Sequence, residues 1–315
     1  MTRPGGWVPS GTTTVAGVIG SPVRHSLSPA LLNAAFAAAD LDWTYAAFEV
    51  PAGGAASALE AMRSLGLGGL SVTMPHKSAV AAAVDEIDNA AALLGAVNCV
   101  VPGDDGSLKG YNTDGGGFLR SLQVDAGFDP FGKHIVLLGA GGAARAVGVA
   151  LALHASTTSP VGGTPPTTTS GGSLPAVGSL VVVNRTEERA SDLVALVDTI
   201  HPRWARVGTV DDVAKADLVV HASPVGMAGT PTAGDVPVPA GALRRGQVVA
   251  DLVYHPRTTP LLAQANAVGA TAVDGLGMLL HQAATQFELW TGHLAPVEAM
   301  RAALQRAVEP SAGVR

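Results

Sequence analysis

The sequence predicts an α/β fold, because short apolar strands alternate with helical patterns along the chain and do so in two separate series. In the first series we expect strands at 15–19, 44–50 and 70–72, with helices at 29–39 and 55–64 between them. This alternation is typical of parallel βαβ units, and it argues against a β-sandwich or a helical bundle.

The first helix has a defined start in the sequence. Ser28 is expected as its N-cap and Pro29 as its first helical residue, where a missing amide hydrogen is tolerated. Beyond this start, apolar residues recur with the spacing of one helix face, at Leu31, Leu32, Ala35 and Phe36.

The second series begins at residue 134 and indicates a second domain. Its strands are expected at 134–138, 180–183, 218–221 and 248–253, and its helices start near Gly142, near Thr186 and at about Thr259. From Gly275 to about Val308 the chain is expected to be helical, and this part could pack on either sheet.

One segment, residues 155–178, fits neither series. Ser, Thr, Gly and Pro dominate it, and such a composition buries too little apolar surface to order itself. Because a helix and the next strand normally need only a few residues between them, we expect a flexible surface insertion with no part in function.

Composition limits the class of protein. A chain of 315 residues with 47% hydrophobic residues can bury ordinary cores, and its single cysteine, Cys99, excludes an internal disulfide framework. No apolar leader or membrane-length segment is apparent, and a net charge of −6 with scattered Lys and Arg offers no basic stripe for nucleic acid. We expect a cytoplasmic globular enzyme with neither a membrane nor a nucleic acid as partner.

The clearest chemical motif follows the strand at 134–138. It matches the dinucleotide fingerprint G-x-G-x-x-G/A with Gly139, Ala140, Gly141, Gly142, Ala143 and Ala144. Gly139 permits the tight turn, Gly141 lets the backbone approach a pyrophosphate, and Ala144 allows the helix to pack closely on the strand. A plain Gly-rich turn is the alternative, and the strand before the motif and the helix after it argue against that.

The end of the next strand bears on the choice of cofactor. NAD-dependent enzymes usually place Asp or Glu there, whereas this chain has Asn184, Arg185 and Thr186, with Arg189 one turn later. Arginines suit a 2′-phosphate, so these residues favour NADP, with ordinary surface arginines at a helix start as the alternative.

Two other patterns indicate no site. Residues 127–133 match a P-loop up to its lysine, but His134 replaces the required Ser or Thr and the glycines precede the strand. The histidines show no paired metal-ligand spacing, so no metal is expected.

Polar residues also gather in the first series, after predicted strands or turns, at 25–29, 71–77, 95–98 and 110–114. Parallel sheets open a ligand crevice at such strand ends. Taken singly, each group could equally be a helix cap or a loop.

Together these segments resemble the shikimate dehydrogenase family from about residue 15 to residue 291, apart from the insertion. That family shows, in order, HSLSP, NVTxPxK, GAVNT, NTDxxG, GAGGAA, NRT, NxTxxGM, DxxYxPxxTPLL and GxxMLxxQ. This sequence supplies HSLSP, SVTMPHK, GAVNC, NTDGGG, GAGGAA, NRT, HASPVGM, DLVYHPRTTPLL and GLGMLLHQ in the same order. A chance match to so many ordered motifs is negligible.

The resemblance implies a catalytic pair of Lys77 and Asp114. An ammonium next to the ketone would stabilise the alkoxide that hydride transfer creates and could supply its proton, with Asp114 holding Lys77 in place. The sequence leaves open which of the two titrates as the working acid. The resemblance also implies substrate contacts, to the carboxylate from Ser26, Ser28 and Tyr254, and to ring hydroxyls from Thr73, Asn98 and Gln282.

In the cofactor half the resemblance adds Ser223 and Gly275 as cofactor contacts. The chain also departs from the family pattern in several places. Ser71 stands for the usual Asn, Leu32 for a frequent His, and Cys99 for the usual Thr, while His221, Ser223 and Pro224 alter the NxTxxGM segment. The contacts nearest the nicotinamide are therefore the least well supported, and Pro224 removes a backbone donor there.

The resemblance thus implies NADP-dependent reduction of 3-dehydroshikimate to shikimate, in chorismate and aromatic amino acid biosynthesis. A substrate-binding domain would comprise residues 1–113 and 274–315, and a Rossmann NADP-binding domain residues 114–273. Two alternatives stay open, an NAD-preferring quinate/shikimate dehydrogenase and a non-catalytic NADP-binding sensor. The chain is expected to be a monomer or a homodimer.

Overall fold

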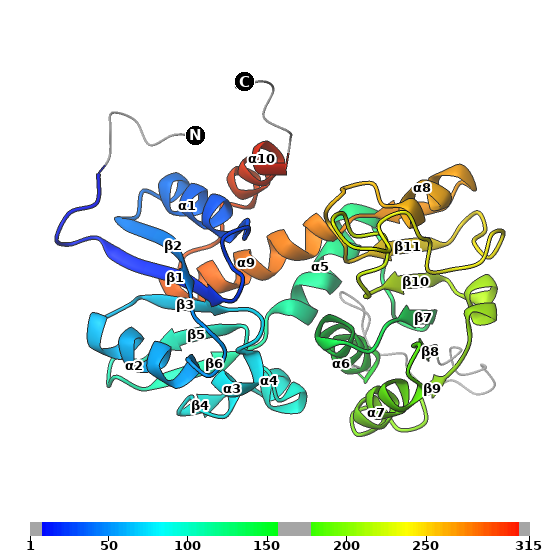
Figure 1. Cartoon of the computed structure of the whole chain (residues 1–315), viewed down its shortest axis with the longest axis horizontal. Helices are drawn as coiled ribbons and strands as arrows, with labels where there is room; N and C mark the ends of the chain where they lie inside the picture. Colours follow the sequence, from blue (N-terminus) through cyan, green and yellow to red (C-terminus); the bar gives the residue numbers. More distant parts are fainter. Residues whose placement is uncertain (1–7, 157–177, 309–315) are drawn as a thin grey trace, which may run out of the picture. The chain divides into compact units, whose positions relative to one another are not determined.

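The computed structural model describes residues 8–156 and 178–308, and the chain forms two compact units. The first unit comprises Met1–Gly117 and Leu279–Arg315, and the second comprises Phe118–Met278 (Figure 1). Each division falls in the first turn of a helix, α5 (Asp114–Ala126) or α9 (Gly275–Thr291), rather than just before it. The start of α5 belongs to the first unit, and Asp114 there is bonded to Lys77 and Asn98 of that unit.

The first unit is built on a six-stranded sheet with strand order β2-β1-β3-β5-β6-β4. β1 pairs in parallel with β2 and β3, as the βαβ pattern predicts, but β5 is antiparallel to both β3 and β6. The three predicted strands thus pair in parallel, whereas β5 and β6, which were not predicted, are joined by a tight turn at residues 103–107 and pair antiparallel. The strands are β1 (Thr14–Gly20), β2 (Trp43–Glu49), β3 (Gly69–Val72), β4 (Glu86–Ile87), β5 (Cys99–Pro102) and β6 (Leu108–Tyr111).

Side chains that alternate along these strands build a separate core on each face. Ile19, Leu70 and Val72 lie in a buried cluster with residues of α2 (Ala55–Leu65), α3 (Lys77–Ala81) and α4 (Asn89–Leu94). On the other side α1 (Ser28–Ala38) packs against α10 (Val297–Val308), and Phe36 of α1 lies 5.5 Å from Phe287 of α9 between ring centroids (Figure 1). The helices thus cover both faces, as expected of an α/β sheet.

The start of α1 differs from the prediction. The helix already includes Ser28, its N-cap is Leu27, and no side chain caps it. The hydroxyl of Ser26 instead accepts a hydrogen bond from the backbone amide of Ser28 at 3.3 Å. Because Ser28 is inside the helix, its hydroxyl is not used for capping.

The second unit is built on an entirely parallel six-stranded sheet with strand order β12-β11-β10-β7-β8-β9. The strand predicted through residue 253 ends at Asp251. The order reverses at β7, which is the topological switch point of a doubly wound sheet. The strands are β7 (His134–Leu138), β8 (Ser179–Val183), β9 (Ala205–Val207), β10 (Leu218–His221), β11 (Val248–Asp251) and β12 (Thr271–Val273).

Both faces of this sheet are buried, which explains its continuous apolar strands. Ile135 and Leu137 join a core with α5, α6 (Gly142–Ser156) and α7 (Glu187–Asp198). Val136 and Leu138 join the opposite core with the 3₁₀ helix η1 (Val210–Lys215) and α8 (Pro260–Ala267). The predicted α/β class is therefore confirmed.

The C-terminal region, expected to be helical, forms two helices, α9 and α10. α9 ends at Thr291, and Gly292 follows with a φ of 68°, a left-handed conformation that stops a helix. Pro296 then precedes α10.

Two other expectations concern the predicted insertion and membrane-spanning helices. Residues 157–177, most of the predicted insertion, lie outside the described part of the chain. Among residues 8–156 and 178–308, none of the helices combines the length and the apolar character needed to cross a bilayer.

Gly69 in β3 tests the packing of the first unit. A Cβ at this position would lie 2.4 Å from the indole of Trp290, whose Nε1 donates to the carbonyl of Val100 at 3.0 Å. We expect Gly69→Ala to lower the free energy of unfolding by about 1 to 3 kcal/mol, measured by urea denaturation. Gly11→Ala is the control, because its Cβ would meet nothing within 4 Å, and equal losses in both variants would contradict this account.

Candidate functional site

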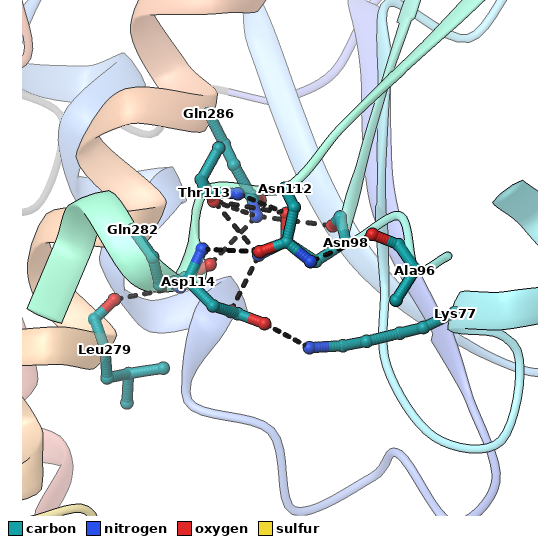
Figure 2. A network of polar contacts seen from close by, with 9 residues as sticks. All are labelled: Lys77, Ala96, Asn98, Asn112, Thr113, Asp114, Leu279, Gln282 and Gln286. Carbon is teal, nitrogen blue, oxygen red and sulfur yellow. Dashed lines mark hydrogen bonds and ion pairs between the residues drawn. The ribbon is translucent and has the colours of Figure 1, made fainter. Parts of the chain in front are cut away.

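Lys77 and Asp114 form an ion pair at the starts of two helices. Lys77 is the first residue of α3 and Asp114 the first of α5, and Lys77 Nζ lies 2.5 Å from Asp114 Oδ2 (Figure 2). Their side chains are 30% and 14% exposed, so the pair is shielded yet open to a small molecule. The two residues are far apart in sequence, and the fold brings them together.

Asn98 bonds the carboxylate oxygen of Asp114 that does not contact Lys77. Its Nδ2 donates to Asp114 Oδ1 at 2.7 Å and to Thr113 Oγ1 at 3.0 Å, while its Oδ1 accepts from the amide of Thr113 at 2.8 Å. Asn98 and Thr113 are both buried. With one carboxylate oxygen bonded to Asn98 and the other to Lys77, Asp114 has a fixed orientation (Figure 2).

Gln286 extends the network into α9. Its Nε2 donates to Gln282 Oε1 at 2.8 Å and to Thr113 Oγ1 and the Asn98 carbonyl at 3.3 Å. Gln282 in turn donates to the carbonyl of Leu279 at 2.9 Å (Figure 2). Sequence reasoning missed Gln286, for which the available signal was a second Gln one turn after Gln282, and it gave no role to Thr113, which lies in the NTDGGG segment.

Ser71, a departure from the family pattern, belongs to the same network. Its hydroxyl donates to Gln286 Oε1 at 2.5 Å and accepts from the hydroxyl of Tyr45 at 2.6 Å. Burial raises the pKa of Tyr45, and hydrogen bonds with Ser71 and Ser28 oppose part of that rise. Tyr45 is thereby connected through Ser71 to the network that reaches the Lys77–Asp114 pair.

The turn before Lys77 is anchored by a residue the sequence did not single out. His76 is buried, and its Nε2 lies 2.8 Å from the carbonyl of Val50. Thr73, half-buried in the same turn, lies against Gly20, where a Cβ would meet its methyl group at 2.4 Å. These contacts fix the backbone from which Lys77 projects.

In the second unit the Gly-rich turn has the geometry that a pyrophosphate needs. Gly139 has a φ of 124°, and a Cβ there would lie 2.7 Å from the carbonyl of Ala222. Gly141 and Gly142 are exposed, a Cβ on either would meet nothing within 4 Å, and α6 begins at Gly142. A helix N-terminus with open backbone before it is a ready anion site.

The remaining predicted cofactor residues lie at strand ends of this sheet. Ala140 is buried and Ala143 exposed in the Gly-rich turn. Arg185, Thr186 and Arg189 are exposed after β8, and Asn184 donates to the carbonyl of Thr186 at 2.9 Å. Ser223 follows β10, and Gly275 follows β12 in a place where a Cβ would meet the carbonyl of Leu252 at 2.5 Å.

The predicted substrate residues are divided between the units. Ser26, Ser28, Thr73, Asn98 and Gln282 belong to the first unit with the ion pair, whereas Tyr254 belongs to the second. Burial raises the pKa of Tyr254, so its phenol stays neutral and able to donate.

A shielded Lys–Asp pair in one α/β unit and a Gly-rich dinucleotide turn in the other define a nicotinamide-dependent dehydrogenase. The family model described as "Shikimate dehydrogenase substrate binding domain" matches residues 18–100, and that of the "Shikimate 5'-dehydrogenase C-terminal domain" matches residues 275–305. The chain is 45% identical over 308 residues to the shikimate dehydrogenase (NADP(+)) of Moorella thermoacetica, covering 96% of each. The chain belongs to the shikimate dehydrogenase family, and that prediction is confirmed.

Solved structures agree with this assignment. A shikimate dehydrogenase in complex with NADP+ superposes with a TM-score of 0.85 at 35% identity, covering 98% of this chain and 100% of that chain. The quinate dehydrogenase of Corynebacterium glutamicum in complex with NAD superposes with a TM-score of 0.80 at 31% identity, covering 93% and 99%. The fold is therefore shared by enzymes that differ in cofactor and substrate.

Two adjacent glycines of α5 provide a matched test of the site. A Cβ on Gly117 would lie 2.6 Å from the backbone nitrogen of Gln282, whereas a Cβ on exposed Gly116 would meet nothing within 4 Å. We expect Gly117→Ala to push α9 away from α5 and to lower kcat by about 10- to 100-fold, because small displacements near reacting groups are costly.

The same substitution at Gly116 is the control. Alanine is a better helix former than glycine, so Gly116→Ala should raise the free energy of unfolding by about 0.5 to 1 kcal/mol without loss of turnover. Steady-state rates and urea denaturation of both variants check the pair. Equal activity of the two variants would show that the close approach of Gly117 to Gln282 does not control the site.

Proposed function

We propose that this chain catalyses the NADPH-dependent, reversible reduction of 3-dehydroshikimate to shikimate, in the route to chorismate and the aromatic amino acids. The observation that carries the proposal is the Lys77–Asp114 pair, held by Asn98 inside the unit that the substrate-binding family model matches. The curated relatives, which span nearly the whole chain, are named for this activity.

The residues of the second unit fit the cofactor. Gly139 and Gly141 leave the backbone open, and the N-terminus of α6 offers free amide hydrogens to a pyrophosphate. Arg185 and Arg189 would bind the 2′-phosphate, and Asn184 and Thr186 would line the ribose pocket. When bound, the reduced dinucleotide supplies the hydride.

The protein itself must bind and orient the substrate and donate one proton to it. An ammonium has three hydrogens that it can donate in hydrogen bonds. Lys77 uses one of them in its hydrogen bond to Asp114, so the others can be donated to the substrate oxygen. As the ketone carbon is reduced, Lys77 stabilises the negative charge on that oxygen and donates a proton to it. Asp114 and Asn98 keep the ammonium in place throughout.

The substrate contacts follow from the first unit. We assign the hydroxyls of Ser26 and Ser28, with Tyr254, to the carboxylate, and Thr73, Asn98 and Gln282 to the ring hydroxyls. Asn98 uses both amide hydrogens, for Asp114 and Thr113, so a ring hydroxyl would take the place of one of these two partners. The Gln282 amide already uses its oxygen for Gln286 and one hydrogen for Leu279, so one hydrogen remains for a ligand. The cytoplasmic location and the monomeric or homodimeric state stay predictions.

The catalytic pair is tested by Lys77→Ala. We expect kcat to fall by about 10²- to 10⁴-fold, because general acid catalysis and charge stabilisation are lost together. The measurement is the initial rate of shikimate-dependent NADP reduction, followed by nicotinamide absorbance. Lys109→Ala is the matched control, since it removes another Lys of this unit that pairs with Glu86 at 3.2 Å on the surface. Near-normal turnover of Lys77→Ala would refute the proposed role.

Cofactor choice is tested by Arg185→Ala. We expect the preference for NADP over NAD, measured as the ratio of dissociation constants, to fall by about 10- to 100-fold, the value of one charge-assisted hydrogen bond. Arg120→Ala, which removes an exposed arginine bonded to Gln123, should leave the ratio unchanged.

The unaltered chain should be assayed with both cofactors and with quinate as well as shikimate. A preference for NAD or quinate would instead indicate a quinate/shikimate dehydrogenase. Binding of NADP without turnover of either substrate would indicate a sensor.

A further inference from the structure

A buried chain of hydrogen bonds lies at the ends of β10 and β11. His221 Nδ1 lies 2.9 Å from Asp251 Oδ1, and His221 Nε2 lies 2.6 Å from Ser223 Oγ. The side chains of His221 and Asp251 are fully buried, whereas Ser223 is half-buried. Asp251 is held in turn by the hydroxyl of Thr259 at 2.6 Å and the amide of Val253 at 3.0 Å.

Each hydrogen bond among Asp251, His221 and Ser223 can be assigned a donor and an acceptor. An ionised carboxylate only accepts, so Nδ1 of His221 carries the hydrogen that points to Asp251. We assign His221 the tautomer whose one ring hydrogen is on Nδ1, so that Nε2 accepts the hydroxyl hydrogen of Ser223. The oxygen of Ser223 also accepts from the amide of Val225 at 3.4 Å, so in this arrangement it presents one lone pair, rather than a hydrogen, to a ligand.

The position of Ser223 in the sheet indicates which ligand group it meets. The Gly-rich turn follows β7, and Gly139 lies directly against Ala222, the residue before Ser223. In a doubly wound sheet the pyrophosphate binds at this turn and the adenosine ribose at the end of the next strand, here β8. Because β10 flanks β7 on the opposite side from β8, the nicotinamide half extends toward Ser223.

We propose that His221, held by Asp251, is a positioning residue that makes Ser223 a hydrogen-bond acceptor for the carboxamide NH₂ of the nicotinamide. This inference rests on the proposed function, since it requires a nicotinamide dinucleotide. It assigns a role to a histidine that stands where the family pattern has Asn, and it adds Asp251 as the group that sets the tautomer of that histidine. His221 and Asp251 act through Ser223 and touch no substrate.

The test compares NADP+ with its 3-acetylpyridine analogue, in which a methyl group replaces the amide NH₂ and the carbonyl is kept. Dissociation constants are measured with the full chain by titration calorimetry. We expect the unaltered chain to bind NADP+ about five-fold more tightly than the analogue, the value of one neutral hydrogen bond. In Ser223→Ala that ratio should fall close to one.

His221→Asn separates the role of His221 from that of Ser223. The Asn amide can replace Nδ1 toward Asp251 but is too short to reach Ser223, so the ratio should fall as in Ser223→Ala. The matched controls are His134→Asn and Ser179→Ala, which break a His–Ser hydrogen bond of 2.9 Å at the opposite end of the same sheet and should keep the original ratio.

Binding of 2′-phosphoadenosine diphosphate ribose, which lacks the nicotinamide, shows whether the adenosine half of each variant is intact, and it should not change. Unchanged discrimination in Ser223→Ala would overturn the inference, and unchanged discrimination in His221→Asn alone would overturn the positioning role. Should His221→Asn fail to fold, Ser223→Ala still decides the contact. Failure of the unaltered chain to bind NADP+ would overturn the proposed function and this inference with it.

Discussion

The side-chain amide of Asn98 is the interaction on which the site depends. It bonds Asp114 on one side and both the hydroxyl and the amide of Thr113 on the other. An amide is suited to this place because it donates and accepts at once, and both groups are satisfied in a buried position. A hydrophobic residue here would leave buried polar atoms unpaired, and Asp114 would lose the bond that orients it toward Lys77.

The fold class and most elements around the site were predictable from sequence, because hydrophobic periodicity and Gly or Pro positions are local signals. The antiparallel direction of β5 was not predictable, since it depends on the short turn between β5 and β6 rather than on hydrophobic periodicity. Ser28 was misassigned as a cap because the residue type suits that role, while the helix starts one residue earlier.

The site itself was predictable only where residues belong to short contiguous motifs. Lys77, Asn98 and Asp114 were identified from three such motifs, but their contacts come from tertiary structure. Gln286 belongs to no motif, and its role appears only when α9 packs against the sheet and places its amide beside Thr113. Sequence reasoning therefore identified the residues of the ion pair and missed Gln286, which bonds Thr113, the residue before Asp114.

The departures from the family pattern show a similar dependence on distant partners. Ser71 replaces the usual Asn and is paired with Gln286, 215 residues along the chain. His221 also replaces an Asn and is paired with Asp251, 30 residues away. A shorter hydroxyl or a longer ring changes the distance that a partner must span, so each substitution needs a partner of complementary length and polarity to avoid an unsatisfied buried group. What looks in sequence like loss of a family residue is, in both units, an alternative hydrogen-bond network in which the new side chain has a partner of its own.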